Sequence, residues 1–262
     1  MTVALVLVGA AGRMGRAVEQ AAAQVPGFAV KARVDREAGL PAGAAGWTAD
    51  AAAVLARGDV AVEFASPAAC AALAALCAGR GAGLVSGTTG LSAAEEEAVR
   101  AAAARVPVVR AANFSLGVAA LRRAVRAALE VLPPGWDLEI VERHHRMKAD
   151  SPSGTALALA RDAALARGRD PEALRFGRER GRTGPRPADE IAVHAIRGGT
   201  WVGDHAVLAA GEGEWLELRH VAQDRLAFAH GALAAARFVA TAPPGLYTLE
   251  DVLAAGSRSH QT

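Results

Sequence analysis

Two histidines, a lysine and a predicted helix start lie within one short stretch of the 262-residue chain, from Glu142 to Ala156. The stretch reads ERHHRMKADSPSGTA. His144 is a candidate proton donor because an unperturbed imidazole has a pKa of about 6.5. Lys148, four residues later, can donate a proton or neutralise a carboxylate. So many ionisable groups are costly in a folded domain unless they bind a charged ligand or move protons.

The end of this stretch predicts a carboxylate site. Ser153, Gly154 and Thr155 precede and open a predicted helix over 155–166, where backbone N–H groups and hydroxyls can meet an anion. The alternative is a solvated charge run capped by Ser151 or Ser153. No metal site is predicted, because adjacent histidines cannot readily ligate one ion. A serine nucleophile is not predicted either, because the G-x-S-x-G elbow is missing.

A second candidate site is the glycine-rich segment from Gly9 to Gly15, which reads GAAGRMG between a predicted strand over 3–8 and a predicted helix over 16–24. Backbone N–H groups without bulky side chains can close on a pyrophosphate at a helix N-terminus. The spacing is G-x-x-G-x-x-G rather than the usual G-x-G-x-x-G. A turn that needs glycine only for its conformation is the alternative.

An acidic residue supports the dinucleotide interpretation. Asp35 ends the second predicted strand, where a carboxylate can accept hydrogen bonds from an adenosine ribose and so favours NADH. Arg36, with Arg13 nearby, can instead pair with a 2′-phosphate. The alternative is a solvated acid–base pair. We predict that both NADH and NADPH bind.

Two further turns follow predicted parallel strands, at the edge where ligands of open α/β sheets collect. One is Gly87-Thr88-Thr89, with hydroxyls and bare backbone, and the other runs from Ala111 to Phe114. Ordinary loop chemistry explains either turn alone. Together they could line a nicotinamide pocket.

The elements around these turns alternate between strand and helix up to about residue 112. Strands are predicted over 3–8, 28–34, 59–65, 84–86 and 106–112, with helices over 16–24 and 67–80 and one that begins at a Ser92–Glu95 capping box. This alternation predicts an α/β fold with a Rossmann-type, doubly wound parallel sheet.

The second half of the chain has a different pattern. Helices are predicted over 118–131 and 155–166, a strand over 138–141 and a long exposed loop over 168–189. Three strands, 191–197, 201–209 and 215–221, read as a meander, which predicts an α+β domain with an antiparallel or mixed sheet. A helix over 228–240 and a polar tail follow.

Composition narrows the possible partners. Hydrophobic residues make up 52% of the chain and aromatic residues 4%, and the net charge is +2, so a nucleic-acid partner is not predicted. Cys70 and Cys77 share a helix face and are expected to be buried free thiols. No apolar run approaches the roughly 18 residues of a membrane span, and the first residues have no basic leader. We therefore expect a soluble, cytoplasmic protein with no membrane partner.

At this point a family resemblance becomes specific. The run ERHHRMKADSPSGTA, the turns GAAGRMG and GTTG, and AANFS at 111–115 occur in the order found in the dihydrodipicolinate reductase family, which the chain resembles over its whole length. The resemblance implies reduction of 4-hydroxy-tetrahydrodipicolinate to tetrahydrodipicolinate by NADH or NADPH, in lysine biosynthesis through diaminopimelate. His144 and Lys148 would be catalytic, and His145, Ser153, Gly154 and Thr155 would bind the dicarboxylate substrate. The implied cofactor residues are Gly9, Ala10, Ala11, Gly12, Arg13, Met14, Asp35, Arg36, Gly87, Thr88, Thr89, Ala111, Ala112, Asn113 and Phe114.

The resemblance also implies an organisation into two domains. Residues 1–114 with 225–262 would bind the dinucleotide, and residues 115–224 would bind substrate and build a homotetramer. The chain departs from the family pattern at Glu63, where aspartate is usual, and at Ala65, which lacks a hydroxyl. The alternatives are another two-domain nicotinamide oxidoreductase acting on a small amino or keto acid, and a non-catalytic dinucleotide-binding sensor.

Overall fold

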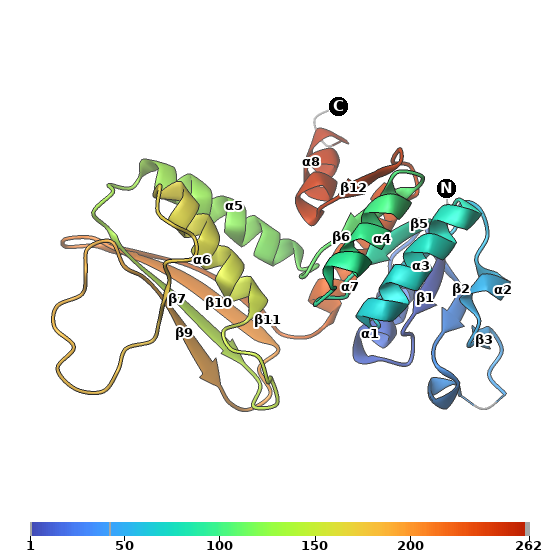
Figure 1. Ribbon diagram of the computed structural model, residues 1–262, viewed down its shortest axis with the longest axis horizontal. Coiled ribbons are helices and arrows are strands. Elements are labelled where there is room, and N and C mark those ends of the chain that lie inside the picture. Colours follow the sequence, from blue (N-terminus) through green and yellow to red (C-terminus); the bar gives the residue numbers. More distant parts are fainter. Residues whose placement is uncertain (1, 42, 260–262) are drawn as a thin grey trace. The chain divides into compact units, whose positions relative to one another are not determined.

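The computed structural model describes residues 2–41 and 43–259, which form two compact units. The first unit contains the chain up to residue 116 and again from residue 225 onward. The second unit, residues 117–224, is inserted between these two stretches. Figure 1 shows a sheet in each unit with helices packed on it.

The first unit is built on a seven-stranded sheet in the order β12-β6-β5-β4-β1-β2-β3, with every neighbouring pair parallel. β1 is an interior strand of this sheet and a continuous apolar run, and its Leu5, Val6 and Leu7 are all 1% exposed or less. The doubly wound parallel sheet that the sequence predicted is confirmed. The strands are β1 (Val3–Val8), β2 (Phe28–Val34), β3 (Trp47–Thr48), β4 (Val60–Glu63), β5 (Gly83–Ser86), β6 (Pro107–Arg110) and β12 (Gly245–Tyr247).

The helices of this unit begin and end where local signals place them. Pro67 opens α3, Gly81 ends it with a φ of 70°, and Ser92 and Glu95 form the predicted capping box of α4. Cys70 and Cys77 are buried free thiols, as predicted, and burial raises the pKa of each to about 12. The helices are α1 (Arg13–Gln24), the 3-10 turn η1 (Glu37–Gly39), α2 (Ala51–Val54), α3 (Pro67–Arg80), α4 (Ala93–Ala103), α7 (Leu226–Val239) and α8 (Leu249–Ser259).

The second unit holds a five-stranded mixed sheet in the order β11-β10-β7-β9-β8. β10 runs antiparallel to β7 and β11, whereas β7 and β8 run parallel to β9. α5 and α6 cover one face of the sheet, and their apolar side chains form a core with those of β7, β9 and β10 (Figure 1). The elements are α5 (Leu116–Val131), β7 (Asp137–His144), α6 (Gly154–Ala166), β8 (Arg175–Phe176), β9 (Ile191–Arg197), β10 (Gly203–Ala210) and β11 (Trp215–Ala222).

Two sequence predictions about these elements were wrong. Strands 191–197 and 203–210 are not hairpin neighbours of a meander, because β7 lies between them and pairs with both. The predicted polar tail contains β12 and α8. A signal for α8 was present, since Thr248 and Asp251 form a reciprocal cap in which the Thr248 N–H donates to Asp251 Oδ2 at 2.7 Å.

Two element boundaries also differ from the prediction in ways that affect the candidate sites. α1 begins at Arg13, three residues before the predicted start, so the glycine-rich turn leads directly into helical N–H groups. β7 continues to His144 instead of ending at Val141, so His144 lies on a strand. Within residues 2–41 and 43–259, no helix is long and apolar enough to cross a membrane.

Candidate active site

The candidate catalytic histidine lies at the end of a central strand of the mixed sheet. β7 buries every second side chain, so Leu138 and Ile140 join the core, and Glu142 and His144 follow them on the same face. Glu142 is fully buried and His144 is 9% exposed. The alternating burial of side chains that builds the core therefore continues to the end of β7, where the buried positions are the ionisable residues Glu142 and His144.

Glu142 is the centre of this cluster. Its Oε2 lies 2.6 Å from His144 Nδ1 and accepts from Arg197 Nη1 at 2.8 Å. Its Oε1 accepts from Arg197 Nη2 at 2.8 Å and from the backbone N–H of Ser153 at 3.0 Å. Arg197 ends β9, the parallel neighbour of β7, and also donates to the Asp150 carbonyl at 2.8 Å. One carboxylate thus joins the ends of two strands to the start of α6.

These contacts shift the pKa values of both members of the pair. Burial alone would raise the pKa of Glu142, but hydrogen bonds from Arg197, His144 and the Ser153 backbone outweigh burial and hold the pKa below its ordinary value. Burial lowers the pKa of His144, and the hydrogen bond and charge of Glu142 only partly oppose that effect. Since a carboxylate only accepts hydrogen bonds, Nδ1 of His144 carries the proton of this contact. Nε2 is then the atom that can exchange a proton with a ligand.

Lys148 lies in the turn after β7, where its ammonium is paired with a carboxylate. Nζ lies 2.9 and 2.8 Å from the two carboxylate oxygens of Asp150, whose side chain is 65% exposed. The charge of Lys148 also contributes to lowering the pKa of His144, so the two groups share one electrostatic environment. The neighbouring His145 is anchored by its backbone N–H, which donates to the Trp201 carbonyl at 2.8 Å. The sequence predicted Lys148 in this site but not its partner Asp150.

The start of α6 lies beside the carboxylate–histidine pair. Ser153 caps the helix, and its Oγ accepts from the Ala156 N–H at 3.2 Å. Ser153 is buried, Thr155 is half-buried and Gly154 is exposed. A Cβ on Gly154 would contact no atom of the described residues within 4 Å. The first helical N–H groups therefore border a position without a side chain, which is an arrangement suited to a carboxylate.

Arg197 and His205 were not predicted from the sequence to belong to this cluster, and neither was the role of Glu142. Arg197 lies 55 residues from Glu142, and His205 lies 52 residues from its partner Ser153. Only the pairing of β9 and β10 with β7 brings these groups together. For Glu142 a local signal existed, since its spacing of two residues from His144 places both side chains on one face of a strand.

The glycine-rich turn joins β1 to α1 at the carboxyl edge of the parallel sheet. Gly9 has a φ of +75°, and a Cβ there would lie 2.8 Å from the Phe64 carbonyl oxygen. A Cβ on Gly15 would overlap the backbone of Gly9 and Ala10. Gly12 is the N-cap of α1 and supplies no side-chain cap, so the first N–H groups of the helix are available to an anion.

Asp35 shapes this turn from the end of β2. Its Oδ2 accepts from the Ala11 N–H and its Oδ1 from the Arg36 N–H, both at 2.8 Å. Arg13 and Arg36 are exposed. Burial, and then the charge of Arg13, lower the pKa of Arg225 at the start of α7. Arg225 is thus a further cation near the turn, and the sequence did not reveal it.

The turn after β5 is fixed by a buried carboxylate. Glu63, fully buried at the end of β4, accepts from the Thr88 hydroxyl at 2.7 Å, from the Ala65 N–H at 3.0 Å and from the Ser86 hydroxyl. The Thr88 hydroxyl is therefore bound within the chain, whereas Thr89 is exposed. Glu63 ties the ends of β4 and β5 together.

The turn after β6 is held by packing. Phe114 is 2% exposed and meets Phe64 edge-on, with ring centroids 5.7 Å apart. Asn113 Oδ1 accepts from the Ser115 N–H at 2.7 Å, and Ala112 is exposed. The predicted cofactor residues at 9–14, 35–36, 87–89 and 111–114 thus follow parallel strands of one unit, and the predicted substrate residues at 144–155 lie in the other.

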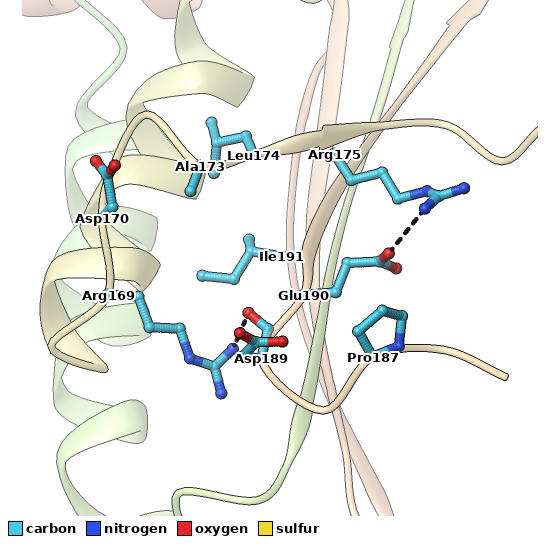
Figure 2. Close-up of a pocket in the computed structure, with 9 residues that line it drawn as sticks. All are labelled: Arg169, Asp170, Ala173, Leu174, Arg175, Pro187, Asp189, Glu190 and Ile191. Atoms are coloured by element: carbon cyan, nitrogen blue, oxygen red, sulfur yellow. Dashed lines mark hydrogen bonds and ion pairs between the residues drawn. The ribbon is translucent and has the colours of Figure 1, made fainter.

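A cavity of about 560 Å³ in the second unit is lined by other residues than those of the candidate site (Figure 2). Several of its charged groups contact one another or the backbone: Glu190 contacts Arg175 and Arg178, and Arg169 donates to the Asp189 carbonyl at 2.9 Å. The buried carboxylate–histidine pair has no counterpart in that lining. We therefore place the candidate active site at the pair. The lining residues are Arg169, Asp170, Ala173, Leu174, Arg175, Pro187, Asp189, Glu190 and Ile191.

The fold and the two sites define a class of protein. A parallel sheet with a glycine-rich first turn is the architecture of dinucleotide-binding domains. The other unit holds a histidine next to a carboxylate and a helix N-terminus, which are groups for proton transfer and anion binding. This combination is that of a two-domain, nicotinamide-dependent oxidoreductase.

Comparison with known proteins narrows this class to one family. Family models described as dihydrodipicolinate reductase, N-terminus and C-terminus, match residues 3–114 and 117–253. A 4-hydroxy-tetrahydrodipicolinate reductase of Anaeromyxobacter sp. (strain Fw109-5) is 45% identical over 95% of this chain and 97% of its own length. One of Thiobacillus denitrificans is 46% identical over 97% and 99%. The chain therefore belongs to the dihydrodipicolinate reductase family and is an oxidoreductase, as the sequence predicted.

A solved structure shows the same fold. Dipicolinate-bound dihydrodipicolinate reductase from Paenisporosarcina sp. TG-14 superposes with a TM-score of 0.76 at 22% identity, over 95% of this chain and 98% of that one. Together, the Rossmann-type sheet and the family support the use of a pyridine nucleotide.

Proposed function

We propose that this chain reduces 4-hydroxy-tetrahydrodipicolinate to tetrahydrodipicolinate, with loss of water, in the diaminopimelate route to lysine. The observation that carries the proposal is the buried Glu142–His144 pair beside the start of α6, in a chain whose relatives are named for that activity. A dianionic ring that must gain a proton requires an acid and a carboxylate site together. This one cluster supplies both.

The substrate carboxylates would be held by Lys148 and by the start of α6, where Ser153, Gly154 and Thr155 present the first helical turn. His145 would add a contact from the turn after β7. The dipicolinate bound to the Paenisporosarcina protein is itself a ring with two carboxylates, and this supports a ligand of the same class here. Cationic and helix-terminal donors are the groups that such a dianion needs.

The residues of the first unit fit a pyridine nucleotide. The backbone conformation of Gly9 excludes a side chain, and the uncapped start of α1 offers N–H groups to a pyrophosphate. Asp35 would accept hydrogen bonds from the adenosine ribose, and Arg36 with Arg13 would meet a 2′-phosphate, so we propose that NADH and NADPH both serve. The turns at 87–89 and 111–114 would line the nicotinamide. When bound, the reduced nicotinamide supplies the hydride.

His144 would supply the proton through Nε2, because Nδ1 is engaged by Glu142. Glu142 orients the ring and stabilises its protonated form, which burial disfavours. Lys148 would act as a second donor near the substrate. The histidine returns to its resting state by taking a proton from solvent after each turnover.

The experiment that tests the proposal supplies freshly synthesised substrate and follows the loss of the near-ultraviolet absorbance of NADH or NADPH. Oxidation is expected with both cofactors, and its absence with both would refute the assignment. His144→Gln should lower kcat far more than it raises KM, because it removes help given in the transition state. His194→Gln is a matched control, since His194 also faces a carboxylate, with Nε2 2.6 Å from Glu139 Oε2, outside the cluster.

A non-catalytic dinucleotide sensor would behave differently. In that case His144→Ala would leave both dinucleotide binding and the biological effect intact.

Assembly as a homotetramer and a cytoplasmic location stay predictions from the sequence. Sedimentation of the purified chain tests the first of them.

A further inference from the structure

A second histidine lies against the candidate catalytic one. His205 is on β10 and is paired in register with Glu142 of β7, so the two residues lie opposite each other on adjacent strands. The rings of His205 and His144 meet edge-on, with centroids 5.1 Å apart and an interplanar angle of 71°. His205 is 3% exposed. The contact is therefore formed inside the unit and not at its surface.

His205 also contacts the start of α6. Its Nε2 lies 3.0 Å from Ser153 Oγ, and that oxygen accepts from the Ala156 N–H at 3.2 Å. The backbone N–H of Ser153 in turn donates to Glu142. A strand residue far away in the sequence is thus bound to the residue that caps the proposed carboxylate site.

The surroundings keep the His205 ring neutral. Its Nδ1 is buried and has no hydrogen-bond partner among the described residues, so a second ring proton there would be a buried, unsatisfied donor. A charged ring would also repel a protonated His144 at the edge-on contact. Burial, and then the charge of His144, lower the pKa of His205 to about 4. Because His205 is neutral, His144 is the only one of the two rings that carries a positive charge when it is protonated.

We propose that His205 is a positioning residue, which fixes Ser153 and the start of α6 against His144 through a neutral imidazole. This inference rests on the proposed function, because it assumes that α6 binds a substrate carboxylate. His205 does not exchange a proton in the reaction. Its effect is on where the substrate carboxylate lies relative to His144.

The test compares variants of the full chain saturated with NADH. His205→Phe keeps a ring but removes the nitrogen that contacts Ser153, whereas His205→Gln can place an amide near the position of Nε2. Loss of one neutral hydrogen bond corresponds to about a two- to tenfold change in affinity. His205→Phe should therefore weaken dipicolinate binding and raise KM by about that factor, with kcat changed less than about twofold. In His205→Gln, both the dipicolinate affinity and KM should lie close to their wild-type values. Calorimetry measures the dipicolinate affinity without any turnover.

A double-mutant cycle separates positioning from simple packing. Ser153→Ala removes the same contact, so the double variant Ser153→Ala with His205→Phe should bind dipicolinate no more weakly than the worse single variant. Additive losses of dipicolinate affinity in the double variant would overturn the proposal. Equal losses of affinity in His205→Phe and His205→Gln would also overturn it, and so would wild-type affinity in His205→Phe. If His205→Phe does not fold, the same cycle is run with His205→Leu, which also lacks the nitrogen, and an effect that persists without Ser153 refutes the proposal. His194→Phe is the control for changing a histidine of the same sheet.

The outcome also distinguishes this inference from the proposed function. A wild-type chain that neither binds dipicolinate nor oxidises NADH with substrate refutes the proposed function. A wild-type chain that does both, with variants that fail the pattern above, refutes only the role of His205.

Discussion

Replacement of Glu142 by glutamine is the sharpest perturbation of the proposed proton donor. Glu142 is fully buried, and its carboxylate lies 2.6 Å from His144 Nδ1. A hydrogen bond to a charged group contributes about 1.5–3 kcal/mol, and 1.36 kcal/mol corresponds to one pKa unit. Glu142 raises the pKa of His144 against the effect of burial. Glu142→Gln should therefore lower that pKa by about one to two units, while Lys148, Arg197 and His205 still face the ring.

The sign of the change fixes the expected pH profile. A proton donor must be protonated to act, so the alkaline limb of kcat/KM should move to lower pH by about one to two pH units. The assay is nicotinamide oxidation between pH 5 and 9, with the melting temperature as a check on folding. Glu139→Gln is the matched control, because Glu139 of the same strand contacts His194 and Arg186 instead. A folded Glu142→Gln protein whose alkaline limb does not move would refute the reasoning.

Three further predictions concern single charges. Arg36→Ala should reduce the preference for NADPH over NADH in kcat/KM, because the exposed guanidinium can pair with a 2′-phosphate; an unchanged ratio would exclude that role. Asp150→Asn should change stability by less than about 1 kcal/mol, because the Asp150 side chain is largely exposed. It should lower the substrate KM up to about fivefold by freeing the Lys148 ammonium, and a raised KM would contradict this. Glu63→Gln should raise the KM for NADH about three- to tenfold, because the Thr88 hydroxyl loses a charged acceptor. Calorimetry should show an unchanged dipicolinate affinity, and a loss of that affinity would argue against a local effect.

Much of the first unit could be predicted because its signals are local. The apolar run of β1, Pro67 at the start of α3 and the capping box at Ser92 each specify an element within a few residues. Sheet order is different, because strand pairing depends on distant partners. The sequence between β9 and β10 does not show that β7 lies between them, and the meander was therefore a reasonable but wrong prediction.

The candidate site divides in the same way. His144, Lys148 and Ser153 come from one continuous motif, so residue type and spacing were enough to select them. Arg197 and His205 could not be selected, since neither lies in a motif and each joins the cluster through strand pairing. Their contacts are what turn a charged sequence motif into an ordered network around Glu142.

The insertion of one unit within the other has a consequence for how the chain folds as it is synthesised. The second unit is continuous, so all of its elements emerge before α7. The sheet of the first unit is covered only after α7 has been synthesised, because α7 packs on β4, β5 and β6, with Val239 against Gly83 and Gly231 against the Phe114 carbonyl. We expect a chain that is released after residue 225 to expose the uncovered apolar face of that sheet to chaperones, while its residues 117–224 still pack as a complete unit.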